Sequence, residues 1–287
     1  QRFLWVDRSG REGETVGDPG AVSNPAFAPG GDRLAFDLVD PRSGKSNIWV
    51  RDLKRGVSSR FTFGAAGALC PLWSPDGRLL VFTVGNDLFE KAVEGQGEEK
   101  LLFKSDEAKF ACDWSRDGKY IAYSSQGKET DFDIGVLPTF GERKPIPVLN
   151  TQFRETTPVF SPDGRFLAYS SNESGRAEIY VQSFPGPGGK WQISTSGGSD
   201  PHWRADGKEL YYRAPDQKVM AVDIQAGSSV TAGTPQPLFQ GLFATASGRS
   251  TFLPTADGLR FLTVATLGRD AMTPTTVVLN WYAELGH

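Results

Sequence analysis

A short phrase recurs six times along the chain, at an interval that few architectures use. Its clearest copy, residues 71–82, reads Pro-Leu-Trp-Ser-Pro-Asp-Gly-Arg-Leu-Leu-Val-Phe, and close variants span 112–123 and 158–169. The aligned glycines, 41 to 51 residues apart, are Gly31, Gly77, Gly118, Gly164, Gly207 and Gly258. A period in this range, built from short strands, is typical of a radial β-repeat. We therefore predict an all-β fold, a six-bladed β-propeller.

One copy of the phrase shows how a blade would form. The sequence Ser-Pro-Asp-Gly at 74–77 suits a type I turn, because proline presets φ, aspartate accepts backbone hydrogen bonds and glycine adopts a positive φ. Strands are expected before and after this turn, with a third near 88–92 and a fourth near 101–103. Four such strands make one antiparallel blade. Because the turn aspartate and the aromatic residue before it recur, we assign both a structural role.

The two ends of the chain carry strand-like segments that belong to no complete repeat. They are residues 4–6, followed by 14–16, and residues 277–279. A circular fold hides its edges by completing one blade from both termini. We expect the N-terminal strands to pair with the C-terminal blade, giving a single domain over residues 1–287. Seven blades are the alternative, if a preceding half-blade belongs to the natural protein.

Composition and charge exclude several classes of partner. The net charge is −3 with no long run of one sign, which argues against nucleic acid or an anionic membrane surface. No apolar run approaches the ~20 residues needed to span a bilayer. The chain starts in mid-strand at Gln1 without a signal-peptide pattern, so we interpret it as a piece of a longer protein. Any membrane attachment would then come from an upstream segment.

Residues that could carry chemistry are few. No Gly-x-Ser-x-Gly elbow is present, and the only histidines are His202 and His287, which argues against a histidine-based triad or zinc site. We interpret His202 as a strand histidine with satisfied hydrogen bonds. Asp131, Asp133 and Glu155 carry oxygen ligands of the kind calcium prefers, but Asp-x-Asp alone is a weak pattern. We expect no enzyme activity, no cofactor and no metal.

Two cysteines, Cys70 and Cys112, stand near the starts of neighbouring repeats. Two cysteines do not make a disulfide framework. Cysteine is among the residue types most often buried, so we expect two buried thiols in strands. A bridge between blades is the alternative in an oxidising compartment.

The residues just before each phrase are the best candidates for function. In a propeller the innermost strand of each blade starts at one mouth of the central channel, so these residues converge as a ring. The candidate binding residues are Asn24, Lys109, Arg154, Glu155, Asp200 and Arg249. We expect the polar loops 40–47, 126–133, 171–178 and 267–275 to open on the same face. The hypothesis is a surface for a protein or peptide, with a small molecule or ion in the channel as the variant. Solvated loop charges without function are the alternative.

The phrase resembles the WD40-like PD40 repeats of TolB-like propellers, over about residues 20 to 265. The flanks 3–12 and 275–285 are similar to those of propellers attached to bacterial transmembrane serine/threonine kinases, although no kinase motif is present. The resemblance implies a non-catalytic sensor or scaffold, the extracytoplasmic (periplasmic or cell-surface) part of a larger signalling protein. One alternative is a propeller lyase or glycosidase that uses Asp133, Glu155 and Asp200. The other is the gating propeller of a serine peptidase.

Overall fold

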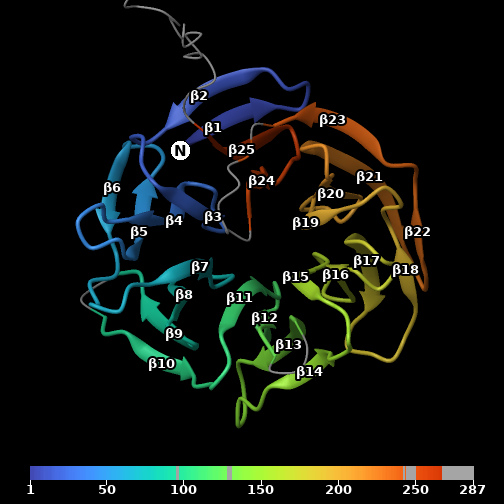
Figure 1. Cartoon of the computed structure of the whole chain (residues 1–287), viewed down its shortest axis with the longest axis horizontal. Helices are drawn as coiled ribbons and strands as arrows, with labels where there is room; N and C mark the ends of the chain where they lie inside the picture. Colours follow the sequence, from blue (N-terminus) through green and yellow to red (C-terminus); the bar gives the residue numbers. More distant parts are fainter. Residues whose placement is uncertain (95–96, 128–130, 242, 244–249, 267–287) are drawn as a thin grey trace, which may run out of the picture.

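The strands of this chain form a closed ring of blades. The structure, a computed structural model, describes residues 1–94, 97–127, 131–241, 243 and 250–266. Its 25 strands form six antiparallel sheets around a central axis (Figure 1). The predicted six-bladed propeller is confirmed. Within the described ranges, no helix is long and apolar enough to cross a membrane.

Five blades follow one another along the chain, each with its first strand innermost. The first contains β3 (Val22–Phe27), β4 (Arg33–Val39), β5 (Ser46–Asp52) and β6 (Val57–Arg60). The second contains β7 (Leu69–Trp73), β8 (Leu79–Val84), β9 (Asp87–Ala92) and β10 (Lys100–Phe103). The third contains β11 (Lys109–Trp114), β12 (Tyr120–Ser125), β13 (Asp133–Pro138) and β14 (Ile146–Leu149). The fourth contains β15 (Glu155–Phe160), β16 (Phe166–Ser171), β17 (Glu178–Ser183) and β18 (Lys190–Gln192). The fifth contains β19 (Ser199–Trp203), β20 (Glu209–Arg213), β21 (Lys218–Ala226), β22 (Val230–Ala232) and β23 (Gln236–Gln240).

The sixth blade combines strands from both ends of the described chain. It contains β24 (Phe252–Pro254), β25 (Arg260–Ala265), β1 (Arg2–Asp7) and β2 (Glu12–Val16). Antiparallel pairing of β1 with β25 runs from Arg2 opposite Ala265 to Asp7 opposite Arg260. The ring of Trp5 stacks on Phe27 of the first blade, with centroids 5.7 Å apart. The sheet edges at the two ends of the chain are therefore paired with each other.

The recurring turn is held by its own side chains. Ser74 Oγ donates to Asp76 Oδ1 (2.6 Å), and the Leu79 amide donates back to Ser74 Oγ (2.9 Å). Gly77 has φ of +71°, which glycine tolerates without the penalty of a Cβ. The Ser74 hydroxyl and the Arg78 amide lower the pKa of Asp76. The turn aspartate is therefore a structural acceptor, as predicted.

The aromatic residues before the turns serve two purposes. Trp73 is buried between blades, and its indole N–H donates to the Ala26 carbonyl of the first blade (3.0 Å). Phe27, Trp114 and Trp203 are only partly buried and line the central channel. These three rings also pack against apolar residues of a neighbouring blade, so they serve both the core and the channel wall.

Candidate functional site

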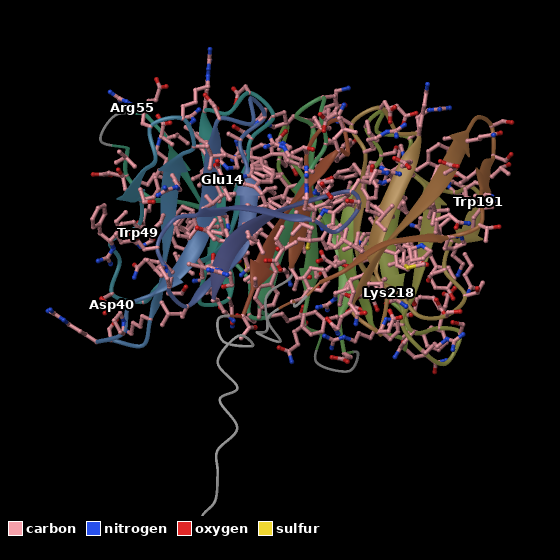
Figure 2. All side chains as sticks on the ribbon, turned by 90° about the horizontal axis from the view of Figure 1, so that it is seen from above. Glu14, Asp40, Trp49, Arg55, Trp191 and Lys218 are labelled. Carbon is pink, nitrogen blue, oxygen red and sulfur yellow. The ribbon has the colours of Figure 1, made fainter. Side chains whose placement is uncertain are left out.

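The ring has two faces that differ in the loops they present. Arg55, in the turn between third and fourth strands, and Asp40, in the loop between second and third strands, lie at opposite faces (Figure 2). The Val39 amide bonds the Ala21 carbonyl (3.1 Å), so the innermost strand starts on the Asp40 side. We call this side the mouth face and the Arg55 side the turn face. The predicted site belongs to the mouth face.

A wide funnel opens on the mouth face and narrows into the central channel. The funnel has a volume of about 1220 Å³ and the channel cavity about 380 Å³. Four residues line both spaces and so mark the narrow point between them, which we call the collar. They are Asn24, Cys70, Thr157 and Asp200.

The collar is built from left-handed backbone turns. All four residues precede a proline and have φ between +46° and +60°. The pairing of their strands shifts at these positions, for example between Leu69 and Leu72 in the second blade. A non-glycine residue with positive φ costs about 1–3 kcal/mol and persists only where its surroundings hold it. The collar therefore requires specific partners.

Polar residues at the ends of the second strands supply part of that support. Asp37 Oδ1 accepts the Cys70 amide (2.8 Å), and Ser124 Oγ accepts the Thr157 amide (3.2 Å) from the next blade. Thr83 Oγ1 donates to the Lys109 carbonyl (2.9 Å). The residues at this repeat position that also line the funnel are Asp37, Thr83, Ser124, Ser170 and Arg213. The sequence analysis missed this ring, although the position is polar in five of the six copies.

Two predicted site residues, Asn24 and Asp200, belong to the collar. Asn24 Nδ2 donates to Asp37 Oδ2 (2.5 Å). Asp200 Oδ2 accepts the amide and the hydroxyl of Thr251 (2.8 and 3.1 Å), and Oδ1 lies 2.9 Å from His202 Nε2. Both residues are buried. They shape the narrow point and present little free hydrogen-bonding capacity to a ligand.

Arg154 is the predicted residue that faces the funnel most openly. Its guanidinium lies 4.4 Å from the ring centroid of Phe132 and pairs with Asp131 (2.7 Å). Phe132 in turn stacks on Phe110, with centroids 6.2 Å apart. Arg154, Phe132 and Phe110 all line the funnel, and we call them the aromatic rim. Arg249, the loop 267–275, the segment 277–279 and His287 lie outside the described residues.

Lys109 and Glu155, which were also predicted as site residues, line neither the funnel nor the channel. Their neighbours Phe110 and Thr156 line the funnel instead. Successive side chains of a strand point to opposite faces, so an error of one residue exchanges the lining for the interior. Lys109 is buried, with Nζ 3.1 Å from Glu107 Oε2 and 5.8 Å from the Tyr123 ring centroid.

Glu155 is enclosed beside the strand start, with 1% of its surface exposed. Thr151 Oγ1 donates to its Oε1 (2.5 Å), while Oε2 has no hydrogen-bond partner among the residues that the structure describes. Burial raises the pKa of Glu155, and the nearby charge of Asp133 adds to this effect. In the ranges that the structure covers, no three His, Cys, Asp or Glu side chains are grouped to hold a metal. The calcium ligand set considered from the sequence is thus not assembled.

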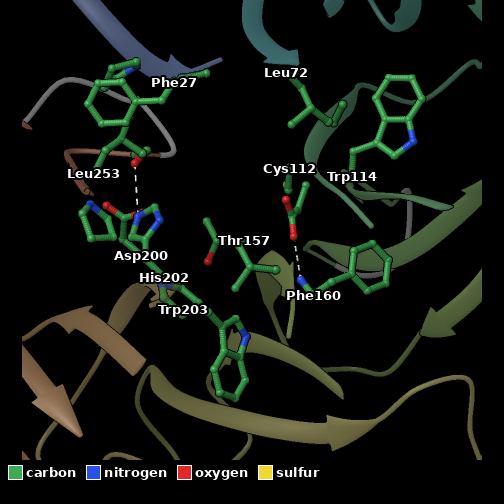
Figure 3. A pocket seen from close by; sticks show the side chains of 18 of the residues that line it. Phe27, Leu72, Cys112, Trp114, Thr157, Phe160, Asp200, His202, Trp203 and Leu253 are labelled. Carbon is green, nitrogen blue, oxygen red and sulfur yellow. Dashed lines mark hydrogen bonds and ion pairs between the residues drawn. The ribbon is translucent and has the colours of Figure 1, made fainter. Parts of the chain in front are cut away.

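Two polar residues that were not among the predicted site residues line the channel cavity. They are His202, which Figure 3 labels, and Asp113. Asp113 Oδ2 accepts the Phe160 amide (2.7 Å), and burial raises the pKa of Asp113 to about 6. His202 Nε2 lies 3.2 Å from Ser250 Oγ as well as close to Asp200. Asp113 and His202 occupy the same repeat position, where the other copies carry Ala26, Leu72, Val159 and Leu253. Two polar residues at an otherwise apolar repeat position were the signal in the sequence that could have indicated these channel residues.

The Ser250, His202 and Asp200 side chains do not form a catalytic triad. A triad uses the two ring nitrogens separately, one toward the carboxylate and one toward the nucleophile. Here the carboxylate and the hydroxyl both approach Nε2. His202 is therefore a hydrogen-bonded strand histidine, as predicted, and it also lines the channel.

Comparisons with known proteins agree with this architecture. Residues 7–146 match the family model of the TolB beta propeller domain, PD40. The Tol-Pal system protein TolB of Thioalkalivibrio sulfidiphilus is 37% identical over 67 residues, which cover 23% of this chain and 15% of that protein. A Bacillus subtilis protein described as the uncharacterized peptidase YuxL is 27% identical over 195 residues, covering 53% of this chain and 30% of that protein. The chain thus spans less than a third of the length of these relatives.

Solved structures show the same fold at low sequence identity. A putative TolB from Agrobacterium tumefaciens has a TM-score of 0.73 at 19% identity, covering 91% of this chain and 96% of that one. An oligogalacturonate lyase in complex with manganese has a TM-score of 0.61 at 14% identity, covering 93% of this chain and 78% of that one. At these identities the likeness extends to the fold alone.

Six antiparallel blades around a central funnel define a β-propeller. The chain is similar to TolB-like β-propellers with PD40 repeats.

Proposed function

We propose that this propeller is a non-catalytic binding module whose funnel holds a peptide segment or loop of a partner protein. The observation that carries the proposal is the funnel itself, about 1220 Å³ in volume, with the aromatic rim on one side. A funnel of this size accommodates several side chains of a partner. Arginine and aromatic residues are the types most enriched among residues that dominate binding energy.

The aromatic rim is organised before any partner arrives. Arg154 is held by Asp131 and by the face of Phe132, and its amide bonds Asn172 Oδ1 (2.8 Å). Side chains that are already ordered lose little conformational entropy on binding. We therefore expect the rim to contribute most of the affinity, while the small polar residues around the funnel provide fit.

The wider setting of the module is part of the same proposal. The flanks resemble those of propellers linked to bacterial transmembrane kinases, and one relative is described as a Tol-Pal system protein. These likenesses support an extracytoplasmic sensor or scaffold within a larger signalling protein. Occupation of the funnel would then report the presence of the partner to the attached domain.

Binding measurements on paired variants test the proposal. Peptides are selected from a random library on the immobilised protein, and their dissociation constants are measured by calorimetry. We expect Phe132→Ala and Arg154→Glu to weaken binding by about tenfold or more. The matched controls, Phe140→Ala and Arg143→Glu, lie in the third blade between its third and fourth strands and leave the affinity unchanged. Equal loss in both pairs, or selection of no binding peptide, contradicts the proposal.

A second candidate function rests on the channel cavity. Asp113 and Asp200 line one cavity, and the raised pKa of Asp113 suits a general acid. An oligogalacturonate lyase shares the fold. Glu155 and Asp133 do not line this cavity. Release of unsaturated products from polygalacturonate, abolished by Asp113→Asn, would favour the lyase. Full activity in that variant, or none in the wild type, counts against it.

A further inference from the structure

A groove on the outer side of the ring, between the first two blades, carries an excess of positive charge. We call it the edge groove, and its volume is about 450 Å³. It is lined by residues of β6, the outermost strand of the first blade, and of β9 in the second. Figure 1 shows these strands on neighbouring blades. Its charged lining consists of Arg33, Arg55, Arg60, Lys91 and Asp52. Four cations face one carboxylate there.

Arg60 and Lys91, two of the four cations, are held by uncharged acceptors. Arg60 donates to the Thr62 carbonyl (2.7 Å) and to Asn47 Oδ1 (2.8 Å), and Lys91 Nζ donates to the Phe61 carbonyl (2.8 Å). Among the described residues, none of the four forms an ion pair. Asp52 accepts two amides of its own turn. The positive field of the groove is therefore not neutralised within the described chain, and it attracts anionic groups.

An exposed aromatic ring stands among these cations. Phe63 is 67% exposed, and the Arg60 guanidinium and Lys91 Nζ lie 5.1 and 5.7 Å from its ring centroid. Cation–π contacts at exposed sites contribute about 0.5–1 kcal/mol each, so the ring is held in place at the solvent. A fixed aromatic ring beside arginine matches the composition of protein-binding hot spots.

The strand that borders the groove has an open edge. The sheet order is β3-β4-β5-β6, so β6 pairs on one side only within the described chain. An open strand edge offers backbone donors and acceptors to an incoming extended segment. Val57 of β6 is 59% exposed and adds an apolar contact beside that edge.

We propose that the edge groove binds an extended, acidic peptide segment of a partner protein. The segment adds as a strand to β6, its carboxylates pair with Arg55, Arg60 and Lys91, and an apolar side chain packs on Phe63. Charge complementarity identifies the occupant as anionic, and the open strand edge identifies it as a peptide rather than a free anion. This inference goes beyond the proposed function, because the groove shares no lining residue with the funnel and its Arg55 lies on the opposite face (Figure 2).

Fluorescence anisotropy with two labelled synthetic peptides tests the proposal. One peptide alternates glutamate with valine and the other alternates lysine with valine. We expect the wild type to bind only the glutamate peptide, with an affinity that falls as salt rises. Arg60→Glu, Lys91→Glu and Arg55→Glu should each weaken binding by about tenfold. Arg55→Glu is the variant least expected to disturb folding, because the Arg55 guanidinium makes no hydrogen bond within the described residues. Weaker binding by this variant therefore reports on the groove itself.

The control variant is Lys208→Glu, which makes the same charge change in the fifth blade. It should bind the glutamate peptide like the wild type. Three results overturn the proposal: no binding of the glutamate peptide, equal loss in Lys208→Glu, or complete displacement of the peptide by inorganic phosphate at equal ionic strength. Peptides selected for the funnel should bind the edge-groove variants normally, so a failure here is distinct from a failure of the proposed function.

Discussion

Arg8 and Glu209, which lie 201 residues apart in the sequence, form a two-pronged ion pair that ties the sixth blade to the fifth. Glu209 also accepts hydrogen bonds from Tyr211 (2.8 Å) and Arg204 (2.5 Å). The Glu209 carboxylate is nearly buried, so removing it leaves several donors without their acceptor. The network therefore ties the N-terminal part of the sixth blade, which closes the ring, to the fifth blade.

Loss of this carboxylate should destabilise the ring. We expect Glu209→Gln to lower the free energy of unfolding by about 2 kcal/mol at pH 7, measured by urea denaturation. The control is Arg11→Ala, because Arg11 and Asp7 form an exposed pair that should contribute less than about 0.5 kcal/mol. Equal effects of the two changes would show that the Glu209 network does not hold the ring.

The same network predicts a pH dependence. Burial opposes ionisation of Glu209, but the hydrogen bonds from Arg8 and Tyr211 outweigh it and lower the pKa of Glu209. A lowered pKa contributes stability above the unfolded value of about 4.5, and this stability is lost as pH falls through the folded value. The difference in stability between wild type and Glu209→Gln should therefore shrink below pH 4.5. A difference that stays constant down to acid unfolding would contradict this account.

The collar depends on Asp37. Asp37 is fully buried and accepts hydrogen bonds from the Cys70 amide and from the Asn24 side chain. Both Cys70 and Asn24 have a positive φ. We expect Asp37→Ala to reduce stability by about 2–4 kcal/mol, measured by thermal unfolding. The exposed Asp40→Ala serves as control, with a change below about 1 kcal/mol. If Asp37→Ala unfolds like the control, the left-handed residues are held by something else.

The buried carboxyl group of Asp113 should make stability depend on pH in a second range. Its pKa is raised to about 6, from an ordinary value of 3.8, because the folded state buries the carboxylate. A raised acid pKa means that stability falls as pH rises from the unfolded value through the folded value. Asp113→Asn should therefore be more stable than the wild type above pH 6, by on the order of 2 kcal/mol, and equal to it below pH 4. Carboxyl NMR titration near pH 4 in the wild type would disprove the shift.

The repeat in the sequence predicts the blades because one local pattern of turn, glycine and apolar strand is copied six times. The same pattern could not place the funnel lining to the residue. Lys109 and Glu155 were chosen where Phe110 and Thr156 line the funnel, because side chains alternate along a strand. The sequence shows that Asp113 and His202 are polar at a repeat position that is otherwise apolar. That both line one channel follows only from the closed ring of blades. The edge groove brings together residues of two blades, and the sequence of its strand β6 has no strong strand pattern. The sequence alone therefore did not predict the groove.

Hydrogen–deuterium exchange with and without a library-selected peptide tests the central claim most directly. Binding in the funnel should slow exchange at the strand starts and loops of the mouth face, in particular 108–112, 131–133 and 153–157. The Ser-Pro-Asp-Gly turns on the opposite face, such as 74–77 and 161–164, should exchange at the same rate in both states. Protection that is confined to those turns, with none around the aromatic rim, would contradict a partner-binding funnel.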